Sequence, residues 1–454
     1  MLHRIPYSLN NNISLYKDII NIQINNKNDI TIKNKYNSNT TFYIDFYKDY
    51  LEISDQFYEL ESFSKKNINL NQVNNYFKNM DLSSNNFFLR ETKILYHGCK
   101  LKKNNKTLII DEIERKNHKL DPVESLNLAM EYISTEQNIA ISFSGGLDST
   151  AIIFTIKEKF PYKNIVAFTW KNKGSSNEDL KHAISICNDL SIQLIILEIK
   201  PEHLLQELDK EKHVIPTYPS TYLASLNFVE YYVTQLDKYF KGQRFTIING
   251  HGGDHIFFET IPLNLLNFDF IINWNKIKDY SLLYSDNYFK LIKSILLNTF
   301  NINSKISFEN FRKKLVDEAK FQTSTTFIKL PEHINIFFPF VTPEMITCGE
   351  NYSLFDSFNE KFTRIHFRNS FYNKFNSQKF FRINKGHMTG AYQRSIKLNY
   401  EKFEKILDSS FIFEKKILDK RFLINHMKLS SIGVNGITPQ LINLLMLEMI
   451  MKVI

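Results

Sequence analysis

The chain has 454 residues, of which 43% are apolar and 23% are charged, so it can bury a sizeable core and is predicted to form two or three domains rather than a disordered tail. Lys and Arg exceed Asp and Glu by 57 to 48, but the lysines are dispersed along the chain, which argues against a nucleic-acid partner. No apolar run has the length of a signal peptide or approaches the roughly 20 residues of a membrane helix, so no membrane span is expected. Cys99, Cys187 and Cys348 lie far apart, which predicts a reducing, cytoplasmic location rather than a disulfide framework.

Residues 1–118 are predicted to form a small β-rich domain. They are rich in Asn, Tyr and Phe, and short strand-like runs such as 41–47 and 107–110 lie between polar turns.

A helix signal at Asp121, Pro122 and Glu124 marks the boundary to a second domain over residues 119–454. Strands are expected at 138–143, 164–169, 192–199 and 245–248, with helices at 149–159, 178–190 and 221–240 between them. This spacing predicts an α/β fold with a parallel sheet that is covered on both faces and binds its ligand at the carboxyl ends of the strands. The rest, from about residue 260, is expected to be mostly helical and to end in an amphipathic helix over 441–454 that packs on the core or on a partner.

The first of these strands is followed by a glycine- and hydroxyl-rich turn in which a helix begins. The turn consists of Ser144, Gly145, Gly146, Leu147, Asp148 and Ser149. The glycines allow a tight turn, and the start of a helix presents unpaired N–H groups, so the turn is predicted to bind phosphate. A carboxylate is misplaced in a pure anion site, and Asp148 is therefore expected to hold Mg²⁺ against the phosphates.

A second glycine-rich turn follows the fourth strand and consists of Asn249, Gly250, His251, Gly252, Gly253 and Asp254. The first turn resembles the SGGxDS signature of the ATP pyrophosphatases, and the second resembles the SGEGSDExF segment of the asparagine synthetases. The resemblance implies an adenine nucleotide alpha-hydrolase-like (PP-loop) synthetase domain that binds ATP, with Asp148 and Asp254 as Mg²⁺ ligands. It also implies nucleotide contacts at Asn249 and Gly250 and an adenine site beside Ala167 and Phe168.

His251 stands where asparagine synthetases have Glu and β-lactam synthetases have Tyr, so the resembling enzymes vary at this position with the nucleophile. An imidazole, whose ordinary pKa is about 6.5, can accept the proton of an incoming amine near neutral pH. A histidine that only donates or accepts a hydrogen bond is the alternative. The next histidine, His255, replaces another Glu of the family segment.

Arginine is scarce in this chain, yet four of its arginines fall close together, at Arg364, Arg368, Arg382 and Arg394. We predict planar contacts to phosphate or carboxylate for this group, with chance clustering as the alternative. The segment 380–386 resembles the R-x-x-K motif of the synthetase family. That resemblance implies that Lys385, beside Arg382, stabilises the transition state of amide formation. Thr342 replaces the aspartate of the family's PFLD segment.

Asparagine synthetases carry a cysteine after Met1 that hydrolyses glutamine, whereas this chain has Leu2 and its first cysteine is Cys99. Glutamine-dependent ammonia delivery is therefore not expected. Residues 95–98 resemble a turn of the glutaminase-like fold. The first domain is accordingly interpreted as a degenerate glutaminase-like domain that serves as a scaffold or as a docking surface for a peptide.

An adenylating enzyme without an ammonia source must use another amine, and the motifs look most like the lasso peptide cyclases of the bacterial microcin type. That resemblance implies AMP-forming activation of an Asp or Glu side chain in a precursor peptide. Attack by the N-terminal amine of the peptide then forms a macrolactam, after a protease partner has removed the leader. A small-molecule amide or β-lactam synthetase and a tRNA-modifying ATP pyrophosphatase remain alternatives.

Overall fold

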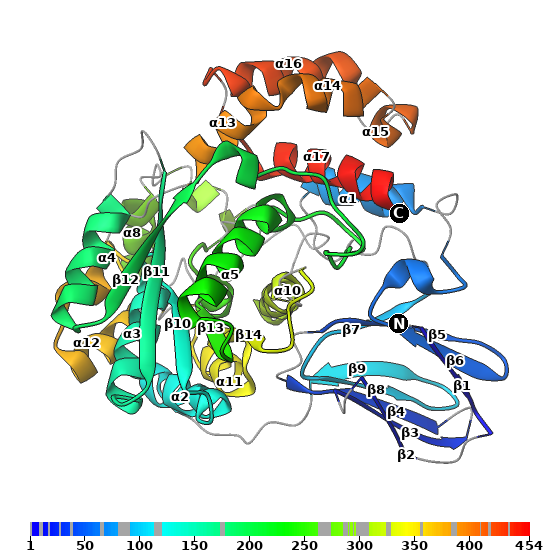
Figure 1. The fold of residues 1–454 in the computed structure, drawn as a ribbon, viewed down its shortest axis with the longest axis horizontal. Helices are drawn as coiled ribbons and strands as arrows, with labels where there is room; N and C mark the ends of the chain where they lie inside the picture. The colour runs from blue at the N-terminus through cyan, green and yellow to red at the C-terminus, as the bar shows by residue number, and fades with distance from the viewer. Residues whose placement is uncertain are drawn as a thin grey trace.

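The structure is a computed structural model. It describes residues 2–8, 12–16, 19–26, 29–36, 40–63, 68–79, 91–112, 120–172, 178–261, 274–284, 289, 291–293, 295–296, 308–323, 328–354, 357–382, 388–408, 410–415, 419–434 and 436–454. Figure 1 shows a β-rich N-terminal unit beside a larger unit of mixed helices and strands, with a layer of C-terminal helices above both.

Within these residues, the N-terminal unit consists of two antiparallel sheets, drawn one above the other in Figure 1. One sheet has the order β1-β6-β5-β7, formed by His3–Pro6, Tyr50–Ser54, Phe42–Phe46 and Lys93–Leu95. The other has the order β2-β3-β4-β8-β9, formed by Asn12–Leu15, Ile20–Asn26, Asp29–Asn34, Cys99–Lys103 and Leu108–Glu112. Strands therefore dominate this unit, as its sequence predicts.

Alternating side chains explain why these segments form strands. In β3, Ile20, Ile22 and Ile24 are buried while the residues between them are exposed, and Ile30 and Ile32 continue the pattern on β4. An apolar side chain at every second position turns one face of a sheet towards the core. The two sheets thus bury their isoleucines together.

The larger unit is built on a parallel sheet of order β12-β11-β10-β13-β14. Its strands are β10 (Asn138–Ser142), β11 (Asn164–Asn172), β12 (Gln193–Ile199), β13 (Phe245–Asn249) and β14 (Ile334–Phe337). The chain runs outward from β10 through β11 to β12 and then returns to place β13 on the other side of β10. The strand order therefore reverses between β10 and β13, and in open α/β sheets such a switch point is where ligands bind.

Helices cover both faces of this sheet, because apolar side chains of each strand point to both sides. On β10, Ile139 and Ile141 face one core and Ala140 faces the other. The first core is closed by α2 (Pro122–Ala129), α3 (Leu147–Lys159), α4 (Glu178–Asp189), α11 (Pro343–Glu350) and α12 (Ile365–Phe375). The second contains α5 (Leu226–Phe240). The predicted α/β fold with a doubly covered parallel sheet is confirmed.

Two details differ from the sequence prediction. The helix expected over 221–240 begins as an α-helix at Leu226, after a short 3-10 turn at Leu223–Ser225. The region after residue 260, expected to be mostly helical, also contributes strand β14, which pairs in parallel with β13. Its helices there include α8 (Trp274–Tyr284) and α10 (Phe308–Gln322).

The C-terminal helices are α13 (Thr389–Leu398), α14 (Tyr400–Asp408), α15 (Phe411–Glu414), α16 (Lys420–Ser431) and α17 (Pro439–Val453). The side chain of Thr438 caps α17 by accepting a hydrogen bond from the N–H of Leu441, and residues 441–450 of this helix are buried. The terminal helix therefore packs on the core. Among the described residues, none of the helices has the length and apolar character required to span a membrane.

The N-terminal unit is joined to the rest of the chain by buried polar contacts as well as by a shared core. Tyr76, on α1 (Leu70–Asn79), donates to the carbonyl of Pro219 at 2.9 Å and accepts from the amide of Asn443 on α17 at 2.8 Å. His97 and Thr323 form a hydrogen bond of 3.3 Å between the sheet region and the end of α10. These contacts fix the β-rich unit against the elements that flank the parallel sheet.

Candidate active site

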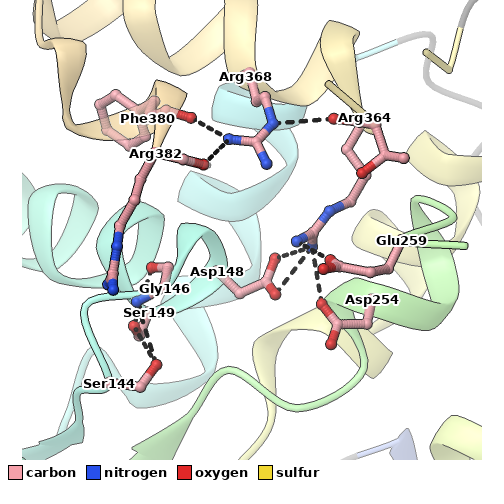
Figure 2. Close-up of polar contacts among 11 residues, drawn as sticks. Ser144, Gly146, Asp148, Ser149, Asp254, Glu259, Arg364, Arg368, Phe380 and Arg382 are labelled. Atoms are coloured by element: carbon pink, nitrogen blue, oxygen red, sulfur yellow. Dashed lines mark hydrogen bonds and ion pairs between the residues drawn. The ribbon is translucent and has the colours of Figure 1, made fainter. Parts of the chain in front are cut away.

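The first glycine-rich turn connects β10 to α3, as the sequence predicts. Gly145 adopts φ +71°, which favours glycine, and Gly146 is the N-cap of the helix. The hydroxyl of Ser149 donates to the carbonyl of Gly146 at 3.1 Å and lies 3.3 Å from the hydroxyl of Ser144 (Figure 2). The first N–H groups of α3 have no partner within the helix, so this turn is built to accept an anion.

The second turn approaches the first one closely, because Ser142 and Asn249 are paired at the ends of β10 and β13. Gly253 provides the space: a Cβ there would lie 2.4 Å from Oδ1 of Asp148. A Cβ on Gly250 would lie 3.3 Å from the backbone nitrogen of Ser149. The glycines of the second turn are therefore required by the close approach of the two turns.

One guanidinium connects the carboxylates of both turns. Nη1 of Arg364 lies 2.8 Å and 3.0 Å from the two carboxylate oxygens of Asp148 and 3.1 Å from Oδ1 of Asp254. Nη2 of the same residue pairs with Glu259. Figure 2 shows the three carboxylates pointing at this one side chain. The structure thus brings together the two carboxylates predicted as metal ligands, places Arg364 of the predicted arginine cluster between them, and adds Glu259.

The electrostatics of this cluster show an excess of negative charge. Burial raises the pKa of Asp148 to about 7, and the neighbouring Asp254 adds to the shift although Arg364 opposes it. Burial disfavours the charged guanidinium of Arg364, but Asp148, Asp254 and Glu259 together raise its pKa. Three carboxylates around one arginine repel one another, so an additional positive charge would stabilise the cluster.

A divalent cation fits this need. Mg²⁺ prefers oxygen ligands and is commonly held by one or two carboxylates together with the phosphates of a nucleotide. Asp148 and Asp254 are suited to that role, since both lie at the rim of the phosphate-binding turn. Within the described part of the chain, no three His, Cys, Asp or Glu side chains form a metal site by themselves. The cation would therefore depend on phosphate oxygens for its remaining ligands.

A cavity of about 210 Å³ lies at this end of the sheet. It is lined by residues of both glycine-rich turns, by Glu259, Arg364 and Arg368, and by Trp170, Lys379, Phe380 and Arg382. The predicted residues among its lining are Ser144, Gly146, Leu147, Asp148, Ser149, Asn249, Gly250, His251, Asp254, Arg364, Arg368 and Arg382.

The two residues predicted to contact adenine lie in the core rather than in the cavity lining. The side chains of Ala167 and Phe168 are fully buried and do not line the cavity, and the carbonyl of Phe168 accepts a hydrogen bond from Phe143 at 2.8 Å. Trp170, two residues further along β11, lines the cavity instead. An indole offers a flat apolar surface on which a purine ring can stack. An aromatic residue near the end of a predicted strand is the sequence signal that could have identified Trp170 as a lining residue.

The clustered arginines have different partners. Arg368 donates to the carbonyls of Thr363, Phe380 and Arg382, so it fixes the backbone that leads into the R-x-x-K segment. Burial lowers its pKa to about 10. Arg382 donates to the carbonyl of Gly145 at 3.2 Å and pairs with Asp179 on α4.

Arg394 lies outside the cavity lining, on α13. Lys385 lies outside the described residues, so its predicted role stays a prediction. Thr342 occupies the N-cap position of α11, but its hydroxyl donates to the carbonyl of Pro339 at 2.8 Å instead of capping the helix.

His251 lies beside two largely buried polar side chains, those of His255 and Glu318. Its ring lies 5.3 Å from the ring of His255, and Nε2 of His255 lies 3.7 Å from Oε2 of Glu318 on α10. Burial lowers the pKa of His255 to about 3 and raises the pKa of Glu318 to about 7. Both shifts favour uncharged side chains, so His255 is neutral near neutral pH.

The sequence of this chain is similar to sequences of known proteins. The family model of asparagine synthase matches residues 126–276, which include both glycine-rich turns. The chain is 26% identical over 351 residues to the microcin J25-processing protein McjC of Escherichia coli, an alignment that covers 74% of this chain. It spans 63% of the length of that relative. The resemblance to asparagine synthetase-like proteins and to a microcin-processing protein is therefore confirmed, and the matched family consists of ATP-utilising ligases.

Solved structures are similar over smaller parts of the chain. An NH3-dependent NAD synthetase from Campylobacter jejuni has 24% identity and a TM-score of 0.16, covering 17% of this chain and 34% of its own. The U34-tRNA thiolase NcsA of Methanococcus maripaludis has 15% identity and a TM-score of 0.23, covering 45% of this chain and 76% of its own. The strand order, not these alignments, defines the fold described above.

Proposed function

We propose that this chain is an ATP- and Mg²⁺-dependent, AMP-forming amide synthetase that closes a macrolactam ring in a precursor peptide, as lasso peptide cyclases do. The observation that carries the proposal is the convergence of Asp148 and Asp254 at the point where the strand order of the sheet reverses. The similarity to a microcin-processing protein supports a peptide as the substrate.

In the first step, an oxygen of an Asp or Glu side chain of the peptide attacks the α-phosphorus of ATP, and the bond to pyrophosphate breaks. The N-terminus of α3, with Ser144 and Ser149, would bind the phosphates. Asp148 and Asp254 would hold Mg²⁺, whose chemistry is to neutralise charge on the departing pyrophosphate. Arg382 donates a hydrogen bond to the carbonyl of Gly145 and so keeps the phosphate-binding turn in position.

In the second step, the N-terminal amine of the peptide attacks the activated carbonyl carbon, and AMP leaves. The amine must lose a proton. His251 lines the cavity and is proposed to accept this proton, directly or through water. Lys385 is proposed to stabilise the charge that develops during this transfer.

The N-terminal unit is proposed to be a degenerate glutaminase-like scaffold that also helps to position the peptide. All three cysteines of the chain are buried, and burial raises the pKa of the Cys187 and Cys348 thiols to about 12. A buried thiol with a raised pKa is a poor nucleophile. The amine is therefore proposed to come from the peptide, after cleavage by a protease partner in the cytoplasm, where ATP is available.

The test is to incubate the chain with Mg-ATP, a precursor peptide encoded beside its gene and the neighbouring protease. We expect AMP and pyrophosphate, together with a peptide one water lighter than the linear core. Asp148→Ala should abolish both products, whereas Asp408→Ala, which removes an exposed carboxylate far from the cavity, should not. ADP and phosphate as products, or AMP formation that survives Asp148→Ala, would overturn the proposal.

A further inference from the structure

Arg364 combines three properties that rarely occur together. It is 4% exposed, it adopts φ +56° although it is not a glycine, and it pairs with three carboxylates. A left-handed conformation costs free energy in a residue with a Cβ and persists where the surroundings impose it, often at functional sites. In addition, its buried Nε–H has no hydrogen-bond partner among the described residues. The backbone at this position is thus held in an unfavourable conformation that delivers a guanidinium between two predicted metal ligands.

We propose that Arg364 takes the place of the divalent cation in the nucleotide-free protein and releases Asp148 and Asp254 when Mg²⁺ and nucleotide bind. The proposal rests on the nucleotide-binding part of the proposed function and adds a positioning residue to it. It makes Mg²⁺ and the guanidinium competitors for the same carboxylate oxygens.

The division of contacts within the guanidinium supports an exchange rather than a permanent pair. In these ion pairs, Nη1 lies against Asp148 and Asp254, and Nη2 lies against Glu259. Glu259 can therefore retain Arg364 while Nη1 gives up its two partners. Phosphate oxygens in the same cavity are suitable new acceptors, since a guanidinium binds phosphate as readily as carboxylate.

The charges around the cluster explain why such an exchange is useful. Without a cation, Asp148 and Asp254 would repel each other at short range, and burial strengthens this repulsion. Arg364 keeps the two carboxylates together and in the same orientation until the nucleotide arrives. A metal that arrives alone must displace the guanidinium without any new acceptor for it, so binding of the metal alone is disfavoured. The arginine thus couples metal binding to nucleotide binding.

The test measures binding of Mn²⁺, in the absence of nucleotide, to the full chain by electron paramagnetic resonance. Arg364→Gln should bind Mn²⁺ about tenfold or more tightly than the wild type, because the competitor is gone. Arg244→Gln is the matched control, since it removes a guanidinium that pairs with Glu136 and does not line the cavity. It should bind Mn²⁺ like the wild type. Asp148→Asn combined with Arg364→Gln should lose the gain.

Thermal unfolding gives a second readout. Mg²⁺ alone should raise the Tm of Arg364→Gln and leave that of the wild type unchanged. If Arg364→Gln does not fold with or without Mg²⁺, Arg364→Lys decides, because a single ammonium cannot span the three carboxylates and should show the same gains in smaller size. Equal Mn²⁺ affinity of the variant and the wild type overturns the proposal. If AMP is still formed by the wild type in that case, the proposed function stands and only the role of Arg364 falls.

Discussion

At Gly253, the absence of a Cβ allows the two glycine-rich turns of the candidate site to lie close together. Replacing Gly253 with Ala would place a Cβ 2.4 Å from Oδ1 of Asp148, and the atom beside it is a fixed carboxylate rather than a flexible chain end. We expect Gly253→Ala to push the two turns apart and to weaken Mg-ATP binding at least about tenfold, equivalent to about 1.4 kcal/mol. Isothermal titration with a non-hydrolysable ATP analogue measures this.

The matched control for that change is Gly436→Ala, because a Cβ at position 436 meets no atom of the described residues within 4 Å. It should bind nucleotide like the wild type. If Gly253→Ala and Gly436→Ala bind nucleotide with equal affinity, nucleotide binding does not depend on the close approach of the two turns.

Glu318 gives the protein a pH-dependent stability at a single residue. Burial raises its pKa to about 7, so the folded chain keeps a proton that the unfolded chain releases near pH 4.5. The contribution of this carboxyl to stability is therefore fully present below about pH 4.5. As the pH rises to 7 and above, the free energy of unfolding falls by up to about 3 kcal/mol. Glu318→Gln removes this loss, so the Tm of the variant relative to the wild type should increase between pH 5 and pH 7.5.

Glu309→Gln, on the same helix at an exposed position, serves as the control for Glu318→Gln. Its Tm difference from the wild type should be the same at both pH values. A constant difference for Glu318→Gln as well would mean that this carboxyl titrates at its ordinary pKa.

At the scale of elements, the helices and strands that could be predicted are those with a strong local signal. Strands β10, β11, β12 and β13 are apolar runs between polar turns, and their predicted bounds differ from the observed ones by a few residues at most. Strand β14 has only four residues, and its role depends on pairing with β13, about ninety residues earlier in the chain. A short run of this kind has no periodicity of its own that separates a strand from a turn.

The same reasoning explains which parts of the candidate site could be predicted. Asp148 could be predicted because it lies in a glycine-rich turn directly after a strand, and Asp254 could be predicted because its segment resembles that of the asparagine synthetases. The contact between Arg364 and Asp148 joins residues 216 positions apart, so no local pattern shows it. The expected adenine contacts depended on how far β11 extends beyond the sheet edge, and the strand reaches Asn172, which leaves Ala167 and Phe168 inside the core.

The start of α2 tests one of these local signals. Asp121 accepts a hydrogen bond from the N–H of Glu124 at 2.8 Å, and the carboxylate of Glu124 accepts from the N–H of Asp121 at 3.3 Å. Asp121→Ala should lower the free energy of unfolding by about 1 kcal/mol because the cap is lost. Asp121→Asn keeps a cap and should stay close to the wild type. Chemical denaturation checks both variants, and equal stability of the two would argue against the cap.

At the scale of the whole molecule, the N-terminal unit and the larger unit share one hydrophobic core, and Tyr76 links them through its hydroxyl. Tyr76→Phe leaves the carbonyl of Pro219 and the amide of Asn443 without this partner, which should cost about 1 to 3 kcal/mol. We expect a lower Tm in calorimetry with a single transition retained. Tyr162→Phe, at a 99% exposed position, should change nothing. A transition that splits in two in the wild type would contradict the shared core.

The order of the strands also sets the order in which the molecule can be assembled during synthesis. Pairings in the N-terminal sheets all lie between residues 3 and 112, and some join neighbouring segments, such as Tyr43 with Ser54, so they can form while the chain is still short. The parallel sheet must wait for β14, and the cavity lining extends from Ser142 to Arg382. Contacts between distant segments form slowly. During refolding, the antiparallel sheets should therefore appear before the ability to bind nucleotide at the proposed site, and a ribosome must deliver most of the chain before that site is complete.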